Sequence, residues 1–569
     1  MKWIKDEIRD KVDFVIWTGD SARHDNDEQI PRNAEQVTGF NKLMVQKMDE
    51  VFGKHNRDEE DDDPNNDYVI PIIPTIGNND ILPHNVMAGG PNTWTRTFAR
   101  IWRQFIPEAQ KHQFEQGGWF YVEVIPNKLA VFSLNTLFFA NNNGAVDGCA
   151  GPHEPGYAQL EWLRIQLQFM RDRGVKAILT GHHPPIRQAA KTMWDETCWQ
   201  KYTLWLRQYR DVIVSSHYGH FNYDHFILQR FKDLNKDSKK GRMSYYPNTA
   251  IDGDFEAEVS SDYWIELREE WSKLPHPPKS LTRAAIEHEV EIDAAKSKNG
   301  NNGDSAKKKR KLYLKKMGGE YAEKFAASFI SPSVVPNLFP TIRIYEYNIS
   351  DLDRHEREQV VPPPAQVADP TYDVDEDRKN AKKERKHKFT IPKPPAKSSP
   401  PGPAYSPQSL SLLRYTQLYA NLTRINNDVH SSQLSDLRRP EYVATQTWKE
   451  GKHKGRQIHD KDPEPDPKKF KFQVLYDTQD DDIYRLPDLT MPHLVDLARR
   501  IGDFQPPKDE SAFDDVGDED RETAAKKKKH RKGGRHAKRN KRNMPWYTFI
   551  TRAFVHTKPA EEIDQEFGQ

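Results

Sequence analysis

Four short apolar runs in this chain each end in a glycine followed by side chains that can ligate a metal. Apolar runs bounded by glycine predict buried strands, and ligands of open α/β sheets collect at the carboxyl ends of strands. Each turn alone has an ordinary interpretation, a hydrogen-bonded polar residue at a strand end. Four together favour one metal site, because carboxylate, amide and imidazole groups suit Mn, Fe, Co or Zn. The turns are Gly19-Asp20, Gly77-Asn78-Asn79-Asp80, Gly181-His182-His183 and Gly219-His220-Phe221-Asn222.

Predicted helices and strands alternate from Met1 to about residue 229. Strand-like runs lie at 69–76, 119–125, 129–135 and 175–180, and a later one at 341–347 alternates apolar and polar residues. A helix with an apolar stripe ends at Gly174, a typical helix-stop residue. This βα alternation indicates α/β layers around a mixed sheet. We therefore assign 1–350 to one α/β domain.

Much of the remaining chain is too polar to form a core. The mean hydropathy is −0.92 and 30% of residues are charged, a composition that cannot bury enough apolar surface throughout. We expect disordered insertions at about 54–67, 233–247 and 270–312, and a disordered Pro/Lys-rich linker at 351–404. A C-terminal extension at 405–513 should pack in part on the core. An acidic and then basic disordered segment follows at 514–544, and an aromatic segment at 545–569.

Charge and cysteine usage leave the partners and the compartment open. The net charge of +1 indicates no partner class. The basic run 526–542 reads as a solvated tail or as a site for polyphosphate, nucleic acid or anionic membrane; specific nucleic-acid binding is not expected. No apolar run is long enough to span a bilayer. Cys149 and Cys198 are either unrelated thiols or one disulfide, and Asn348 and Asn421 begin possible glycosylation sequons.

The four turns resemble those of the calcineurin-like metallophosphoesterases, and longer segments narrow the resemblance. Segments 18–27, 77–80, 194–202 and 218–226 are similar to the fungal vacuolar endopolyphosphatases, in the acid-sphingomyelinase-like branch. The resemblance implies a four-layer α/β/β/α metallophosphoesterase sandwich. It also implies cleavage of phosphoanhydride bonds within long polyphosphate chains by a metal-activated hydroxide. We expect two divalent metal ions, a vacuolar location on the lumenal side of the membrane, and a homo-oligomer to accompany that activity.

The same resemblance assigns the metal ligands. Asp20 would bridge the two metals, and Asn78, His182 and His220 would complete one site. Asn222 stands where relatives usually have a histidine, and could offer a carbonyl oxygen to the second site. The Asp-x-His motif that relatives place upstream is absent from this chain. Because Met1 falls inside a predicted helix, we expect upstream sequence that carries this motif and the membrane anchor of the family.

The catalytic and substrate-binding groups follow from the resemblance with one departure. Most relatives carry a histidine where this chain has Asn79, which cannot donate a proton in the same way. A phosphate leaving group, with a last pKa of about 6, needs protonation less than an alkoxide does. We therefore assign His24, Asn79 and Asp80 as catalytic, and Arg23 with His24 as substrate-binding. The alternatives are a phosphodiesterase of the acid-sphingomyelinase type and a non-catalytic relative that binds polyanions.

Overall fold

The computed structural model describes most of the expected domain and parts of the C-terminal region. The described residues are 1–24, 30–54, 68–244, 261–278, 300–334, 338–352, 386–422, 470–503 and 542–568. The expectations for the acidic loop at 54–67, for most of the linker and for nearly all of the basic run 526–542 therefore lie outside the described residues. Among the described helices, none is both long and apolar enough to cross a bilayer.

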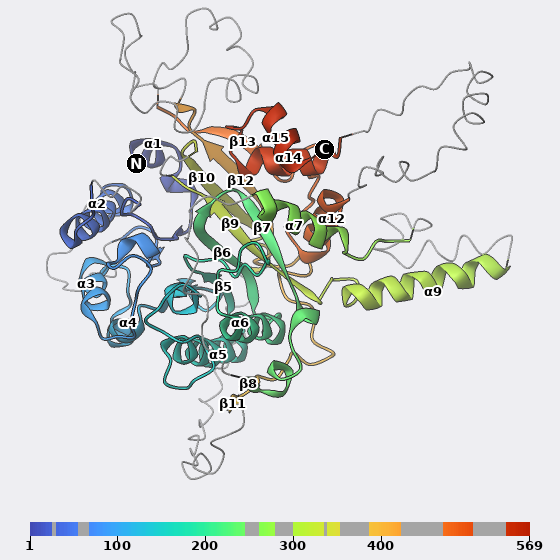
Figure 1. Cartoon of the computed structure of the whole chain (residues 1–569), viewed down its shortest axis with the longest axis horizontal. Coiled ribbons are helices and arrows are strands. Elements are labelled where there is room, and N and C mark those ends of the chain that lie inside the picture. The colour runs from blue at the N-terminus through green and yellow to red at the C-terminus, as the bar shows by residue number, and fades with distance from the viewer. Residues whose placement is uncertain are drawn as a thin grey trace, which may run out of the picture.

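A six-stranded mixed sheet forms the centre of the molecule (Figure 1). Its strands run in the order β3-β4-β5-β6-β9-β7. The inner strands pair in parallel, while β3 and β7 pair antiparallel with their neighbours at the two edges. The strands are β3 (Phe120–Ile125), β4 (Leu129–Ser133), β5 (Lys176–Thr180), β6 (Ile213–Asn222), β9 (Phe325–Pro332) and β7 (His225–Arg230).

Further strands lie against one face of this sheet. β1 (Val15–Trp17) pairs in parallel with β2 (Ile72–Pro74), and the Ser133 hydroxyl in β4 donates to the Pro74 carbonyl at 2.6 Å. β12 (Leu412–Tyr419) pairs antiparallel with both β10 (Thr341–Tyr347) and β13 (Gln473–Asp477). Residues from the C-terminal extension therefore complete a sheet that the first domain begins.

Successive residues of one central strand show the order of the layers. In β6, the Tyr218 hydroxyl lies 2.6 Å from that of Tyr202 in α6 (Glu196–Gln208). The preceding His217 ring lies 4.5 Å from the Tyr345 ring in β10. Because neighbouring side chains of a strand point to opposite faces, helices cover one face and strands the other.

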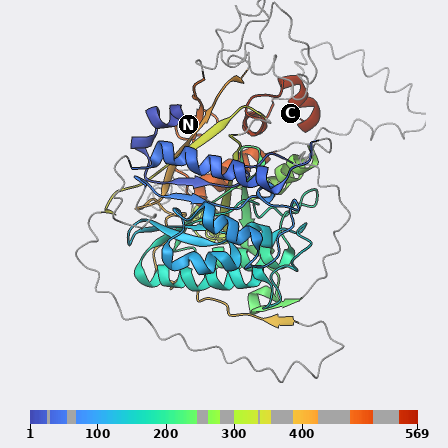
Figure 2. The same cartoon turned by 90° about the vertical axis from the view of Figure 1, so that its left-hand side faces the viewer.

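Helices close the outer side of each sheet layer. α5 (Pro155–Arg173) lies beside α6 on the central sheet, and the Trp205 indole donates to the Leu160 carbonyl. On the opposite side, α2 (Ala34–Phe52), α3 (Thr93–Ile101) and α4 (Lys111–Gly117) cover β1 and β2; Figure 2 views this layer from outside. The layers follow the order α/β/β/α, which confirms the predicted architecture.

The other described elements lie at the ends and edges of these layers. As predicted, α5 ends at Gly174, whose φ of 72° favours glycine. The remaining helices are α1 (Lys2–Glu7), α7 (Ser261–Ser272), α9 (Gly300–Met317), α12 (Met491–Gly502), α14 (Met544–Ala553) and α15 (Ala560–Phe567), and β8 (Arg242–Ser244) pairs with β11 (Lys386–Lys388).

Some segments expected to be disordered are ordered in the described part. β11 and the chain after it pack on α5 and α6: the Phe389 ring lies 5.8 Å from the Trp205 ring, and Gln208 donates to the Pro392 carbonyl. The expectation of disorder is therefore wrong for 386–404, because apolar residues between the prolines find a surface on the helices. The insertions at 233–247 and 270–312 likewise contain β8 and α9.

Candidate active site

The turn after β1 and the turn after β2 pack directly on each other. Asp20 adopts a φ of 58°, in the left-handed region, and the preceding Gly19 a φ of 87°. A Cβ on Gly19 would stand 2.7 Å from the Gly77 nitrogen, and one on Gly77 would overlap the Asp20 carboxylate. Both glycines are therefore needed for the backbones to approach closely enough to bring Asp20 beside Asn78.

Asp80 holds the two turns together. Its Oδ2 accepts the backbone N–H groups of Asp20 at 2.8 Å and Gly77 at 3.0 Å. Its Oδ1 accepts those of Ser21 and Ala22 and the side-chain amide of Asn41. Burial and the neighbouring Asp20 raise the pKa of Asp80, whereas these donors favour its charged form. With both oxygens engaged, the contacts favour a positioning role for Asp80 over the predicted catalytic one.

Asn79 contacts Asp20 directly. Its backbone N–H donates to Asp20 Oδ1 at 2.9 Å, and its side-chain Nδ2 donates to Asp20 Oδ2 at 2.8 Å. Asn79 is fully buried. Its amide therefore fixes the direction of the Asp20 carboxylate, a role that needs no proton transfer.

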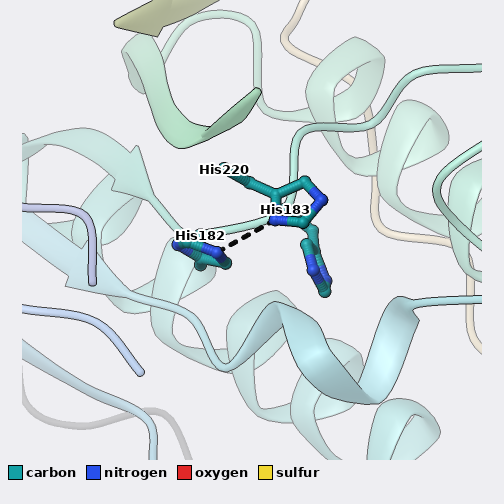
Figure 3. Close-up of side chains that lie close together, drawn as sticks. All are labelled: His182, His183 and His220. Carbon is teal, nitrogen blue, oxygen red and sulfur yellow. Dashed lines mark hydrogen bonds between the residues drawn. The ribbon is translucent and has the colours of Figure 1, made fainter. Parts of the chain in front are cut away.

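Four potential ligand atoms converge at the ends of β1, β2, β5 and β6. His182 Nε2 lies 2.7 Å from Asn78 Oδ1, 3.1 Å from Asp20 Oδ2 and 3.2 Å from His220 Nδ1. His220 Nδ1 is 2.9 Å from Asn78 Oδ1. Figure 3 shows the two imidazoles facing each other across this point. The structure thus brings together Asp20, Asn78, His182 and His220, as predicted for one metal site.

Neighbouring contacts fix the direction in which these ligand atoms point. Asn78 Nδ2 lies 2.7 Å from His84 Nε2 and donates to Asn85 Oδ1 at 2.9 Å, so its carbonyl oxygen turns to the histidines. His182 Nδ1 lies 2.6 Å from the Thr18 carbonyl and donates to it, which leaves Nε2 facing the other three ligand atoms. Acceptor atoms that face one another repel unless a proton or a cation lies between them.

The charge states of the side chains suit a cation. Burial would raise the pKa of Asp20, but His182 and the Asn79 donors outweigh it and hold that pKa far below its usual range. Burial lowers the pKa of His182, but Asp20 outweighs it and raises the pKa. Burial and the adjacent imidazoles hold the pKa of His220 well below its usual range. One carboxylate and imidazoles that are neutral or share a proton form a donor set for a borderline divalent metal.

The spacing of the ligand atoms also fits. Ligands about 2.1 Å from a common metal ion lie roughly 3 Å apart, and the four measured separations run from 2.7 to 3.2 Å. The residues present therefore fit one divalent cation. Asn222, two residues after His220 at the end of β6, adopts a φ of 59° on the same turn; its role as a ligand stays a prediction.

Arg23 and His24 follow Asp20 on the loop. The Arg23 guanidinium donates to the backbone carbonyls of His24 and Ile30, and these contacts hold the loop itself. His24 is partly buried, and lies close enough to the metal-site residues to act electrostatically on His220. Their substrate-binding and catalytic roles stay predictions, with His24 the better placed of the two.

His183 is a site residue for which the sequence offered no role. Its side chain is fully buried, and neither ring nitrogen has a hydrogen-bond partner within the described residues. Its ring lies 4.2 Å from that of His220 and nearly perpendicular to it, and the ligand atoms of the three histidines cluster within 4.8 Å (Figure 3). The sequence also carried no sign that Asn41 contacts Asp80, or that His84 and Asn85 contact Asn78. No local pattern marks residues that orient the side chains of another turn.

The two cysteines are joined in a disulfide. The bond ties the chain before α5 to the first turn of α6, and both sulfurs are buried. This settles the choice between separate thiols and a bridge in favour of the bridge. Asn348 and Asn421 are both partly exposed, and their glycosylation stays a prediction.

Comparison with known proteins agrees with this site. A family model described as calcineurin-like phosphoesterase matches residues 1–220, and such a domain implies divalent metal ions. The chain is 45% identical to an endopolyphosphatase of Neurospora crassa over 550 residues, 90% of this chain and 71% of that protein. It is 32% identical to an endopolyphosphatase of Saccharomyces cerevisiae, over 89% of this chain and 75% of that protein. It is 31% identical to an endopolyphosphatase of Schizosaccharomyces pombe, over 93% of this chain and 77% of that protein. The chain belongs to the endopolyphosphatase family of calcineurin-like phosphoesterases.

Proposed function

We propose that this protein hydrolyses inorganic polyphosphate by cutting phosphoanhydride bonds within long chains. The observation that carries the proposal is the convergence of Asp20 Oδ2, Asn78 Oδ1, His182 Nε2 and His220 Nδ1 on one point. The family relationship supplies the substrate, since the relatives named above are endopolyphosphatases. Phosphoryl transfer depends mainly on positioning and on electrostatic stabilisation, and this site provides both.

The side chains of the site would hold a divalent cation and fix its position. A divalent metal ion held there would act as a Lewis acid on the phosphoryl oxygens and on the attacking water. Asn79 and Asp80 fix the Asp20 carboxylate, while Thr18 fixes the His182 ring. We propose two such ions, of the Mn, Mg, Co, Zn or Fe class, with Asp20 between them and Asn222 on the second.

The substrate class follows from the residues that surround Asp20. Asn79 is committed to Asp20 and has no proton to give a leaving group. A leaving phosphate, with a last pKa of about 6, departs without one, whereas the alkoxide of a diester needs an acid. Of the residues predicted to be catalytic, His24 is the one that could supply such an acid. The geometry therefore supports an anhydride substrate over a phosphodiester.

The test compares long-chain polyphosphate with a chromogenic phosphodiester, using the full chain with Mn²⁺, Mg²⁺ or Co²⁺. We expect polyphosphate to shorten through intermediate lengths on a gel, the diester to react slowly, and excess chelator to stop both reactions. Asp20→Ala should abolish shortening and metal binding. Asp10→Ala, which changes an exposed aspartate that is 90% accessible and pairs only with Arg9 among the described residues, is the matched control. If polyphosphate stays intact under every metal, or the diester reacts faster, the proposal fails.

We also propose a vacuolar, lumenal location. The buried disulfide and the partly exposed Asn348 and Asn421 support an oxidising, glycosylating route. Fractionation of cells that express the tagged protein, with glycosidase treatment of the vacuolar fraction, tests it; a cytosolic, unglycosylated product would contradict it. A membrane anchor and a homo-oligomer stay predictions.

A further inference from the structure

α9 carries an exposed face of lysines that the cleavage site does not use. Six lysines between 307 and 316 are solvent-exposed. Among the side chains placed from residue 307 onward and in the other described segments, no carboxylate forms an ion pair with any of them. Figure 1 shows α9 projecting from the body of the molecule. The six are Lys307, Lys308, Lys309, Lys311, Lys315 and Lys316.

The lysines share the side of α9 that faces away from its own contacts. Met317 is buried, and Arg310 pairs with Glu320 at 2.7 Å, which defines the inner side of the helix. Lys307, Lys311 and Lys315 recur four residues apart, so they form a slanting row along the helix with a spacing of about 6 Å. The row presents three neighbouring point charges.

A solvated helix surface is the ordinary explanation of such a face, and it accounts for only part of this one. Cations in the last helical turn are favoured by the helix dipole, which explains Lys315 and Lys316. Lys307 and Lys311 lie earlier, where like charges four residues apart repel each other and destabilise a helix. A bound polyanion would relieve this repulsion between neighbouring lysines.

The position of α9 relative to the cleavage site is fixed by β9. α9 leads through a short turn into the start of β9, whereas the end of β9 pairs with Asn222, beside the metal ligands. β9 has eight residues, and at about 3.3 Å per residue it spans roughly 25 Å. A ligand that contacts both the lysine face and the metal site must therefore be long.

We propose that the lysine face of α9 binds polyphosphate chains away from the cleavage site and so makes the enzyme favour long chains. This inference rests on the proposed function. Lysines bind phosphates as point charges, with no demand on geometry, and counterion release makes such binding strong for a dense linear polyanion. A narrow row of charges suits a linear ligand better than a planar membrane surface, and Leu312 is the one exposed large apolar residue between these lysines in the described part of the chain.

The experiment uses the triple substitution Lys307→Gln, Lys311→Gln and Lys315→Gln in the full chain, because glutamine preserves helix propensity. For long polyphosphate we expect KM to rise about tenfold with kcat unchanged. The slope of log affinity against log salt should fall by about 2, from three lost phosphate contacts at ~0.7 each. For polyphosphate too short to reach α9, both constants should stay at wild-type values.

The matched control exchanges three exposed lysines at the other end of the molecule, Lys2, Lys5 and Lys11, for glutamine; its KM should equal that of wild type. An unchanged long-chain KM in the α9 variant, or an equal loss on short chains, overturns the inference. Loss of binding to anionic vesicles without loss of polyphosphate binding also overturns it, in favour of a membrane.

Binding of long polyphosphate in the presence of chelator separates this inference from the proposed function. If wild type hydrolyses nothing yet binds polyphosphate through the α9 lysines, the proposed function fails while the binding face stands. If wild type hydrolyses polyphosphate and the α9 variant binds it equally well, the binding face fails alone.

Discussion

Replacing Asp80 by asparagine tests whether this carboxylate holds the metal-site turns or takes part in the chemistry. Asp80 accepts five hydrogen bonds, three on Oδ1 and two on Oδ2. Asparagine has the same shape, but one of its two terminal groups donates instead of accepting. Whichever way the amide turns, an NH₂ group faces at least two N–H donors, and those bonds are lost.

The magnitude follows from that count. A hydrogen bond to a charged group contributes about 1.5–3 kcal/mol, so two lost bonds should lower the free energy of unfolding by at least about 3 kcal/mol. Relief of the repulsion between Asp20 and Asp80, which raises the pKa of Asp80, offsets part of this. The N–H groups left behind belong to Asp20 or Ser21, so the turn that carries the metal ligand loosens. Loss of such an outer partner typically lowers metal affinity 10–100-fold.

Urea unfolding in the presence of a chelator measures the loss of stability. Calorimetric titration with Mn²⁺ or Zn²⁺ measures the loss of metal affinity. Asp195→Asn is the control: Asp195 is a half-buried helix cap whose Oδ1 alone accepts the bonds from Thr197 and Cys198, and asparagine caps helices equally well. A variant Asp80→Asn that keeps wild-type stability and metal affinity but loses activity would refute the positioning role and restore the catalytic one.

Three further outcomes are expected. Replacing Cys149 and Cys198 by alanine opens a loop closed across 49 residues and should lower the free energy of unfolding by about 4 kcal/mol, measured in urea; an unchanged midpoint would contradict it. Burial lowers the pKa of His225 to about 3, while the unfolded side chain titrates near 6.5. The unfolded state therefore binds more protons in between, and stability falls as the pH drops from 6.5 towards 3. Because buried His217 contributes in the same way, His225→Phe should reduce the slope of stability against pH without removing it, and exposed His153→Phe should leave it unchanged. Asn79→Leu, which removes the donor to Asp20 Oδ2, should weaken metal binding at least tenfold by calorimetry while folding cooperatively, and equal affinity would rule out its orienting role.

The strand-and-turn pattern predicted the α/β organisation and the meeting of four turns at one place, and the family resemblance added the order of the layers and the assignment of ligands. The pattern succeeded because both of its predictions depend on local chemistry: glycine permits the positive φ at Gly19, and parallel strands end at the same edge of a sheet. Asp20 and His182 are 162 positions apart, yet each follows a short buried strand, so their meeting could be predicted without knowing any contact.

What the sequence could not show are the residues that act at a distance. Asn41 lies in the middle of α2, and only the packing of that helix on the β2 turn brings its amide to Asp80. The prediction of a disordered linker at 386–404 was wrong for the same reason. Prolines and lysines indicate a linker, but Phe389 packs on Trp205 of α6 and Ile391 packs on the core, and neither contact can be predicted from composition. The hydrogen bonds of Asp80 and Asn79 could not be predicted for this reason as well, since a carboxylate that accepts five bonds looks the same in sequence as a catalytic one; their catalytic roles stay predictions.

Contacts at a distance also tie the C-terminal extension to the turn that carries His220. Asp224, four residues after His220, is 3% exposed and accepts hydrogen bonds from Arg343 of β10 and Tyr476 of β13. Its backbone N–H donates to the Ala553 carbonyl in α14. A buried carboxylate is tolerated only when it is paired and hydrogen-bonded, and removing one partner of such a pair costs about 3–5 kcal/mol. The turn that carries His220 and Asn222 is therefore anchored on chain that follows more than a hundred residues later. The extension thus contributes to the geometry of a metal site whose ligands all precede it in sequence.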